Sequence, residues 1–557
     1  MRRPPGVLSG QELEKMAPTI STLQDVRRAL TCSFEDLAIF KRSRTRAMYN
    51  FLAVLETQSF LADVRGADSK GLYGVNRLAV EASSRAVPAL MRLCNCVIGD
   101  EPTIDEEIFG DAHELYLFSH GYETVEYCLG LAERGQFAGT IDATSNEVEF
   151  SYLSPDESAS DTLLRSAEIE EHIVDNPSRA ALEEMIGAVV VVGNELRRSM
   201  LYTTHDAITY YYSPELVAAM RQWTLLLEKA QRWEFPTTLR VGPTSFGDLR
   251  KFWSSLTAIC NTHGSAQMIA CQSDFRKWPI RSAVNLRPRE EWLKLIAELS
   301  GLSMDVASEW LSWYTFDTRL RQAAPYIRVL IEVAPGMLAA TGTLVTMSSV
   351  ERNFLKLAGV SPELRPYYSG IASAKETIAL EHILSFFAVP SFAAAPRVRI
   401  EGVTDADLVI YELATKFMLI VQHKWLTAPD ELNESIANDE RLTEGVGQAL
   451  ASRDSLRSDA GPAGRALQLP VTEVPNRIEA VVVCRGSEPT GFLPHPAVPV
   501  VTELAFEKMA TRVSNLSELW ELLNARPDHA EAASGFRDVK HIIRLGGFKF
   551  TIPALSA

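Results

Sequence analysis

The sequence has 557 residues, of which 46% are hydrophobic and 23% charged, and a formal net charge of −16. This length allows two to four domains with a large core, and the composition is typical of a globular protein rather than a fibrous or disordered one. The acidic balance excludes a general attraction to nucleic acid, so any contact with DNA or RNA needs a local basic patch.

The cysteines and the beginning of the chain bear on its compartment. Seven cysteines are scattered through the sequence, without the paired spacing or histidines of a zinc site, which predicts reduced thiols. The start, MRRPPGVLSGQELEK, has two arginines but no apolar stretch behind them, so we expect no signal peptide. The apolar runs, including IGAVVVVG at 186–193, are too short to span a bilayer. We therefore expect a cytoplasmic protein without membrane contact.

Residues 1–235 are expected to be a mainly helical region. The stretches 21–40 and 213–235 place apolar residues at helical spacing behind serine, threonine or Ser-Pro starts. Between them, GTIDATSNEVEFSYLSPDESASD (139–161) is polar and predicts a short hairpin followed by an exposed loop.

Residues 236–320 are expected to be helical, with a hairpin of two helices in REEWLKLIAELSGLSMDVASEWLSWYTFD (289–317). The spacing is that of a helix-turn-helix, but the second helix presents Asp305 and Glu309 where a DNA-reading helix presents basic or amide side chains. Trp310 and Trp313 have the spacing of core residues. A packed helical hairpin is favoured over a DNA reader.

Residues 321–557 change to an α/β pattern, with a core predicted at 373–557. PYIRVLIEV and GTLVTMSS are expected to be strands, followed by a helix at 373–388 and the connection VPSFAAAP. Further strands are predicted in RVRIEG, DLVIYE, FMLIVQHKW, RIEAVVVCRG and VPVVTE, with helices between several of them. The fold class is therefore α/β: a mixed sheet flanked by helices, preceded by a large, mainly α-helical region.

Polar residues gather at one end of two of these predicted strands. Side chains alternate along a strand, so Gln422 and Lys424 point to one face and His423 to the other. Asp407 opens the preceding strand, which turns back through ELATK, so that Asp407 and Gln422 are expected at the same end of a hairpin. Asp405 lies two residues earlier and is an alternative to Asp407.

A third acidic residue is expected from the helix before the sheet. There Thr377, Glu381 and Ser385 form a polar stripe beside an apolar face, and this predicts that Glu381 leans towards Asp407. Carboxylates, the amide oxygen of Gln422 and the backbone carbonyl of His423 are ligands suited to Mg²⁺ or Mn²⁺. Such an ion activates water for attack on a phosphate, and a nearby lysine stabilises the transition state.

This order of residues resembles the PD-(D/E)xK nuclease superfamily, and the glutamine in the middle position is most similar to its Mrr-type restriction endonuclease branch. The resemblance covers about 370–557. It implies a restriction-endonuclease-like fold in which Glu381, Asp407 and Gln422 hold the metal and Lys424 is catalytic. Gln448, on the next predicted helix, is similar to a supporting glutamine found in some members.

The function implied is Mg²⁺- or Mn²⁺-dependent hydrolysis of DNA phosphodiester bonds, with a role in restriction or anti-phage defence. Trp425 is a candidate wall of the site. DNA would meet a minority of basic side chains in an acidic domain, with Lys424 joined by Arg397, Arg399, Arg453 and Arg457.

Three alternatives remain open at this stage. Gln422 and Lys424 can instead be the solvated end of an edge strand, with Asp405 and Asp407 as turn residues. The chain can then be a non-enzymatic interaction or scaffold protein with an inactive nuclease fold, whose helical region binds a partner protein or a second copy. A third possibility keeps the site but has it act on RNA or on structured DNA in repair.

Overall fold

The computed structural model describes residues 22–553 except 65–68, 98, 136, 154–178, 205–206, 231–232, 234, 272–276, 317–324, 388–390, 404, 427–431, 471–473, 486–497 and 526–539. Within these residues, no helix combines the length and the apolar character needed to cross a membrane. The first predicted domain boundary, at 235–236, falls among described residues. The second, at 320–321, lies outside them.

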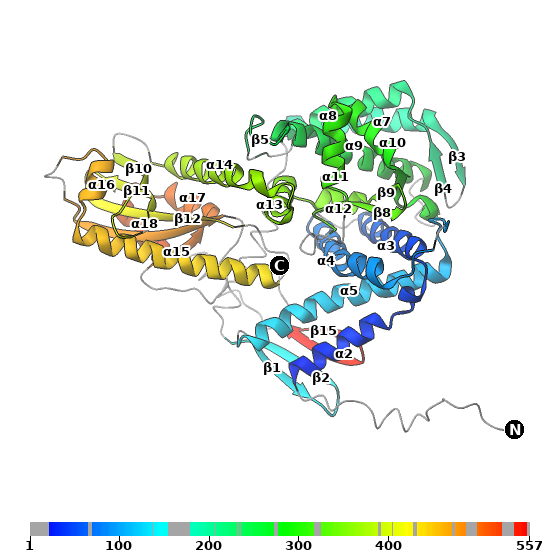
Figure 1. The fold of residues 1–557 in the computed structure, drawn as a ribbon, viewed down its shortest axis with the longest axis horizontal. Coiled ribbons are helices and arrows are strands. Elements are labelled where there is room, and N and C mark those ends of the chain that lie inside the picture. The colour runs from blue at the N-terminus through cyan, green and yellow to red at the C-terminus, as the bar shows by residue number, and fades with distance from the viewer. Residues whose placement is uncertain are drawn as a thin grey trace.

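The first body of the molecule is mainly helical and is built on one large hydrophobic core. Helices supply many of its apolar side chains, and Figure 1 shows how these helices are arranged. They are α2 (Leu23–Glu35), α3 (Arg44–Val64), α4 (Ser69–Leu93), α5 (Glu106–Glu133), α7 (Arg179–Ser199), α8 (Pro214–Ala230), α9 (Phe246–Cys271), α10 (Arg289–Ser300), α11 (Met304–Trp313), α12 (Gly342–Met347) and α13 (Val350–Val360).

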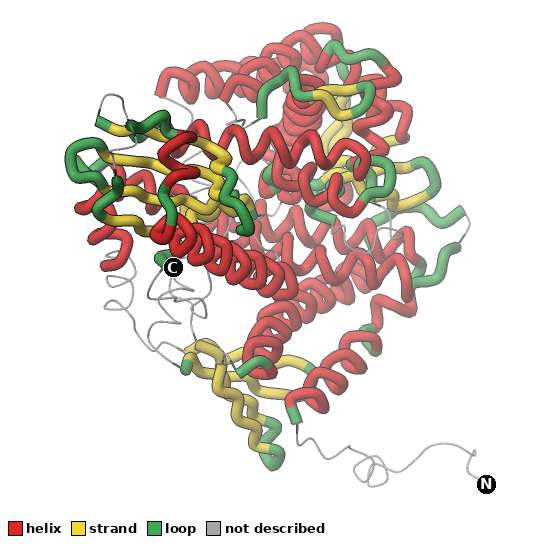
Figure 2. Tube along the Cα trace, turned by 60° about the vertical axis from the view of Figure 1, so that its left-hand side comes forward, coloured by secondary structure: helices red, strands yellow, loops and turns green. Residues whose placement is uncertain are grey.

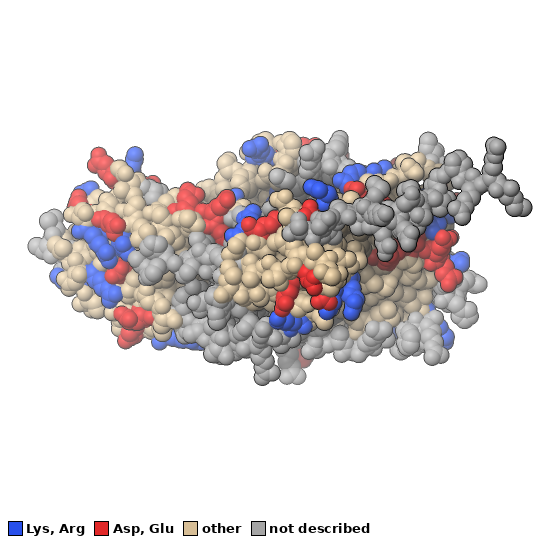
Figure 3. All heavy atoms as spheres, turned by 90° about the horizontal axis from the view of Figure 1, so that it is seen from below, with Lys and Arg blue, Asp and Glu red and all other residues tan. Residues whose placement is uncertain are grey.

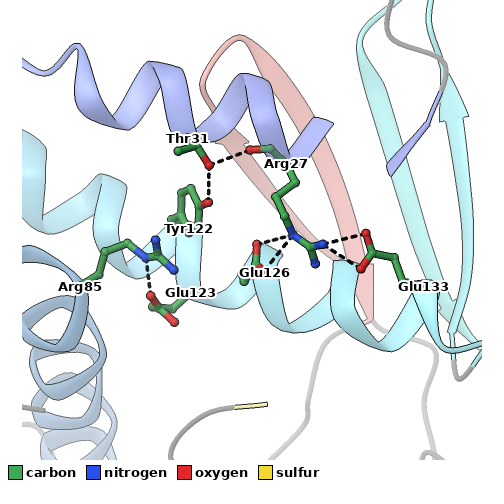
Figure 4. A network of polar contacts seen from close by, with 7 residues as sticks. All are labelled: Arg27, Thr31, Arg85, Tyr122, Glu123, Glu126 and Glu133. Atoms are coloured by element: carbon green, nitrogen blue, oxygen red, sulfur yellow. Dashed lines mark hydrogen bonds and ion pairs between the residues drawn. The ribbon is translucent and has the colours of Figure 1, made fainter. Parts of the chain in front are cut away.

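Helix α2 is fastened along α5 by a network of charged and hydroxyl groups (Figure 4). The guanidinium of Arg27 donates to Glu126 and, at 2.7 Å, to Glu133. One turn further along α2, the Thr31 hydroxyl lies 2.9 Å from that of Tyr122. The guanidinium of Arg85 lies over the Tyr122 ring, 3.8 Å from the ring centroid.

The helical hairpin is packed into this core. Helix α10 ends at Gly301, whose φ of +69° is left-handed, and Ser303 caps α11 by accepting from the Val306 N–H. Trp310 and Trp313 are buried. The tryptophan face of α11 is therefore used for packing.

Strands expected in the carboxy-terminal domain belong instead to the first body. β9 (Met337–Ala340) pairs with β8 (Leu330–Ala334) on one side and with β7 (Asn285–Pro288) on the other, in a three-stranded sheet. The predicted strand GTLVTMSS is wrong: it forms α12, because the Thr341 hydroxyl caps a helix by accepting from the Leu344 N–H.

The last strands also return to the first body. The hairpin predicted at 139–161 is β1 (Phe137–Asp142) with β2 (Glu147–Tyr152). β16 (Phe548–Pro553) lies parallel to β2, and β15 (Lys540–Leu545) completes the order β1-β2-β16-β15. Residues 540–553 therefore lie outside the sheet that carries the predicted site.

That second sheet has five strands in the order β10-β11-β12-β13-β14 and is mixed. β10, β11 and β12 are antiparallel neighbours, whereas β12, β13 and β14 are parallel. It lies with α15 at one side of the molecule, apart from the four-stranded sheet (Figure 1, Figure 2). The strands are β10 (Phe392–Val398), β11 (Ala406–Glu412), β12 (Phe417–Trp425), β13 (Arg477–Arg485) and β14 (Val500–Thr502).

Both faces of the five-stranded sheet are covered by helices. One face packs against α15 (Leu432–Ser458) and α16 (Gly461–Ala466). The other packs against α14 (Arg365–Leu384), α17 (Glu503–Ala510) and α18 (Leu516–Ala525). Helix α14 also contributes Ile371 to the core of the first body, so it joins the two parts (Figure 1).

The edge strand β10 begins before the predicted strand RVRIEG. It runs through FAAAPRV and contains Pro396. Proline lacks an N–H, so it is tolerated in a strand at the edge of a sheet. Because alanine and proline have low strand propensity, the sequence does not predict the first part of this strand.

Candidate active site

Strand β12 is a central strand that carries polar side chains at its end. It lies between β11 and β13, and the β11–β12 ladder ends at the pair Leu408 and Val421. Gln422 is 4% exposed although it follows this ladder directly. A buried amide on a central strand is not the solvated end of an edge strand, so that alternative does not describe Gln422 and Lys424.

Gln422 and Lys424 meet the same side chain on α15. Lys424 Nζ lies 2.7 Å from Gln448 Oε1, and Gln422 Nε2 lies 3.3 Å from that same oxygen. The nitrogen of the Gln448 amide donates to Glu444 at 3.1 Å. The structure thus brings Gln422, Lys424 and Gln448 together across the α15 face of the sheet.

Donor and acceptor chemistry fixes the orientation of both amides. Lysine has only donors, so Gln448 must present its oxygen to Lys424. Gln422 must then present its nitrogen to that oxygen. Its own oxygen, Oε1, is left buried with no hydrogen-bond partner among the residues that the structure describes. A buried acceptor in this state costs free energy unless a ligand or water satisfies it.

The lysine reaches Gln448 over a glycine. A Cβ placed on Gly445 would lie 2.9 Å from Lys424 Cε and 3.2 Å from its Cγ. Glycine in a helix interior is unfavourable by about 1 kcal/mol relative to alanine, so its use here has a packing reason. Sequence reasoning missed Gly445, and the only signal was a glycine within a strongly helical stretch.

Asp407 lies where the ladder between β11 and β12 stops. Its carboxylate accepts the backbone N–H of His423 at 2.7 Å. Burial raises the pKa of Asp407 above its usual value; the His423 N–H and the Lys424 charge oppose this shift, whereas Glu376 adds to it. Asp405 is exposed and precedes β11. Of the two aspartates, Asp407 is the one beside Lys424.

The helix carboxylate acting on Asp407 is Glu376, not the predicted Glu381. Glu376 shares a face of α14 with Leu380 and Ile383, which are buried against the sheet. Glu381 belongs to an exposed stripe with Thr377 and Ser385. The predicted polar stripe is therefore present and exposed, and of its members only Thr377 has a described hydrogen bond to a residue of the sheet, Arg397.

The side chain of His423 lies on the opposite face from Gln422 and Lys424. Its Nε2 is 2.8 Å from Glu503 Oε1, and Arg485 is 3.3 Å from the other oxygen of Glu503. Burial alone would raise the pKa of Glu503, but the His423 hydrogen bond and the Arg485 charge lower it overall. In an extended strand the N–H and C=O of one residue point to the same side. The His423 carbonyl therefore points towards β11, as its N–H does.

Trp425 connects this strand to the first body. Its ring stacks on Phe235 with centroids 5.9 Å apart. Arg485 lies 4.5 Å and Lys375 5.1 Å from the centroid of the same ring. Trp425 is thus an anchor between the two parts of the chain, directly after Lys424.

Two oxygen donors at this end of the sheet are of the kind that hard divalent cations prefer. Asp407 supplies a carboxylate and Gln422 an unsatisfied amide oxygen. Among the described residues, no group of three or more His, Cys, Asp or Glu side chains is placed to hold a metal. Mg²⁺ commonly keeps several waters and is held by one or two carboxylates together with substrate phosphates. The donor set therefore suits Mg²⁺ and does not suit Zn²⁺.

The basic side chains proposed for DNA differ in how far they are engaged. Arg457 pairs with Glu479 and Arg453 with Asp454, while Arg399 is exposed. Arg397 pairs with Glu376. On the face drawn in Figure 3, the described basic and acidic side chains are interspersed.

Comparison with known proteins adds no relative: no protein-family model matches the sequence, and neither a curated protein nor a solved structure was found to match it.

Proposed function

We propose that the five-stranded domain is a metal-dependent nuclease of the PD-(D/E)xK type that hydrolyses DNA phosphodiester bonds. The observation that carries this proposal is the unsatisfied Gln422 Oε1, next to a lysine anchored on Gln448 and close to Asp407. A buried amide oxygen without a donor among the described residues costs free energy unless a cation or a water satisfies it. The mixed sheet flanked by helices is consistent with the proposal.

In this proposal each side chain has a separate role. Asp407 and the Gln422 oxygen would hold the ion, and Glu376 would take the place of Glu381 as the acid supplied by α14. A bound ion would supply an activated water and neutralise phosphate charge. Lys424, held by Gln448, stabilises the negative charge that develops on the phosphate in the transition state.

The helical first body is proposed to choose or restrain the substrate. Trp425 provides the physical connection, since it packs on Phe235 of that body directly after Lys424. A role in restriction or anti-phage defence rests on the family resemblance alone. Action on RNA or on branched DNA would use the same residues.

The test is cleavage of supercoiled plasmid by the full chain with Mg²⁺, with Mn²⁺ and with EDTA. We expect nicking or linearisation with either metal and none with EDTA or with Lys424→Ala. Lys508→Ala, an exposed lysine on α17, is the matched control and should cut normally. Labelled RNA and a branched duplex in parallel reactions identify the preferred substrate.

Thermal unfolding of both variants shows whether lost cleavage reflects lost folding. Cleavage by Lys424→Ala at the wild-type rate would contradict the assignment. A folded wild-type protein that cuts none of the substrates with either metal would favour the scaffold alternative.

A further inference from the structure

Arg397 has an unusual backbone for an arginine in a strand. Its φ is +51°, in the left-handed region that favours glycine and asparagine. It lies in β10 between Pro396, which pairs with Leu408, and Val398, which pairs with Ala406. The position opposite Arg397 is therefore Asp407.

The alternation of side chains is interrupted at this pair of positions. On β10, Ala395 and Val398 both enter the core beneath α15 and α16. On β11, Ala406 and Val409 enter the same core. Core residues three apart instead of two show that the regular pleat stops at Arg397 and Asp407. The side chains of Arg397 and Asp407 are therefore not part of the core beneath α15 and α16.

Arg397 is bound to α14. Its Nε lies 3.0 Å from Glu376 Oε1, and its Nη2 donates to the Thr377 hydroxyl at 3.2 Å. Glu376 is the carboxylate whose charge acts on Asp407. Arg397 therefore holds the second acid of the candidate site.

Stability does not explain this arrangement. About half of the Arg397 side chain and 42% of the Glu376 side chain are exposed, and such ion pairs contribute little. The left-handed backbone costs more for arginine than for glycine or asparagine. An unfavourable backbone that places a charge beside a candidate site indicates a functional role.

We propose that Arg397 is a positioning residue that holds Glu376 while no cation is bound, gives up that carboxylate when the cation binds, and then binds a phosphate of the DNA. This inference rests on the proposed nuclease function. The guanidinium suits both tasks, because it forms paired hydrogen bonds with carboxylates and with phosphates. While Glu376 is paired with Arg397, its carboxylate is engaged by the arginine instead of a cation.

The test compares Arg397→Asn with Arg399→Asn in the full chain. Asparagine tolerates the left-handed backbone, and Arg399 is an exposed arginine two residues away, so both variants lose the same charge. Mn²⁺ binding is measured by electron paramagnetic resonance without DNA. DNA binding is measured by fluorescence anisotropy with Ca²⁺ in place of Mg²⁺.

We expect Arg397→Asn to bind Mn²⁺ about fivefold more tightly and DNA about fivefold more weakly, the range expected for one half-exposed ion pair. Arg399→Asn should leave Mn²⁺ affinity within about twofold, because it is Arg397, not Arg399, that pairs with Glu376, and the charge of an exposed arginine is screened by solvent. Equal Mn²⁺ affinities for the two variants would overturn the role of Arg397, even if Lys424-dependent cleavage stands. If wild type and Asp407→Asn bind Mn²⁺ equally, the site itself is wrong and both proposals fall.

Discussion

Lys424 lies so close to Gly445 that a methyl group on that glycine would come within 2.9 Å of the lysine Cε. The glycine on α15 therefore sets the path by which the ammonium group reaches Gln448. It is a feature of the site that carries no functional group of its own.

Replacing Gly445 by alanine is expected to reduce cleavage while leaving the protein folded. Alanine favours the helix by about 1 kcal/mol, but its methyl must push the Lys424 side chain aside. Misplacing a reacting group by an ångström reduces rates by on the order of a hundredfold. Plasmid cleavage rates and thermal unfolding separate these two effects.

Gly447→Ala is the control for this prediction. Gly447 is on the same helix, and a Cβ there meets nothing within 4 Å. Gly447→Ala should stabilise the helix by the same amount, about 1 kcal/mol, and should keep full cleavage activity. Equal activity of the two alanine variants would show that the approach of Gly445 to Lys424 has no consequence for catalysis.

Replacing Asp407 by asparagine is expected to stabilise the metal-free protein at neutral pH. Burial raises the pKa of Asp407 in the folded state above the usual value of about 3.9. The folded state then binds the proton more tightly than the unfolded state. The stability this gives is complete below about pH 4 and is lost as pH rises through the folded pKa.

Unfolding temperatures from pH 3.5 to pH 8 check this prediction. The melting temperature of Asp407→Asn should exceed that of the wild type at pH 7, and the two melting temperatures should be equal at pH 3.5. Added Mg²⁺ should raise the melting temperature of wild type only. An equal shift by Mg²⁺ in both proteins would place the ion elsewhere.

Replacing Glu503 by glutamine is expected to destabilise the protein by about 2 kcal/mol at pH 7, because it removes the carboxylate that pairs with both Arg485 and His423. The pKa of Glu503 is lowered in the folded protein. Its contribution is therefore present above the unfolded pKa of about 4.3 and disappears as pH falls through the folded pKa. The difference in the free energy of unfolding between Glu503→Gln and the wild type should become smaller below pH 4.

Urea unfolding at several pH values measures the Glu503 effect. Glu507→Gln, on the same helix with a side chain 41% exposed and 3.6 Å from His382, should change stability by less than about 0.5 kcal/mol. A Glu503 effect no larger than this control would mean that the buried network contributes nothing measurable.

Replacing Arg27 by alanine is expected to cost about 1 kcal/mol, because Arg27 bonds two carboxylates of α5 while its side chain is only 29% exposed. Arg28→Ala, an exposed neighbour, should be neutral. Thermal unfolding at low and high salt checks both, and the Arg27 effect should shrink with salt. Identical melting of the two variants would contradict a fastening role for Arg27.

The sequence predicts the central strands of the second sheet well, because β11, β12 and β13 are continuous apolar runs. The hairpin connecting Asp407 to Gln422, and the shared direction of Gln422 and Lys424, also follow from local rules. The edge strand β10 does not, because alanines and Pro396 give it little strand character.

The position of Glu381 was predicted less well, because it is exposed on another face of α14 than Glu376. The buried face of α14 includes Lys375, whose ammonium lies over the Trp425 ring. Because a lysine is expected on an exposed face, the sequence does not indicate that this face is buried. Glu376 and Glu381 differ by five residues, which places them on different faces. Which of the two faces packs against the five-stranded sheet is seen only in the structure.

The pairing of β16 with β2 has no local signal at all. Lys549 and Glu147, whose side chains pair at 2.9 Å, are separated by 402 positions. During synthesis, most of the first body and the whole five-stranded sheet leave the ribosome before this partner strand exists. The hairpin of β1 and β2 must therefore keep an unpaired edge until β16 has been synthesised. Because the five-stranded domain lies in the chain between β2 and β15, deleting it would require cutting the chain at two places instead of one.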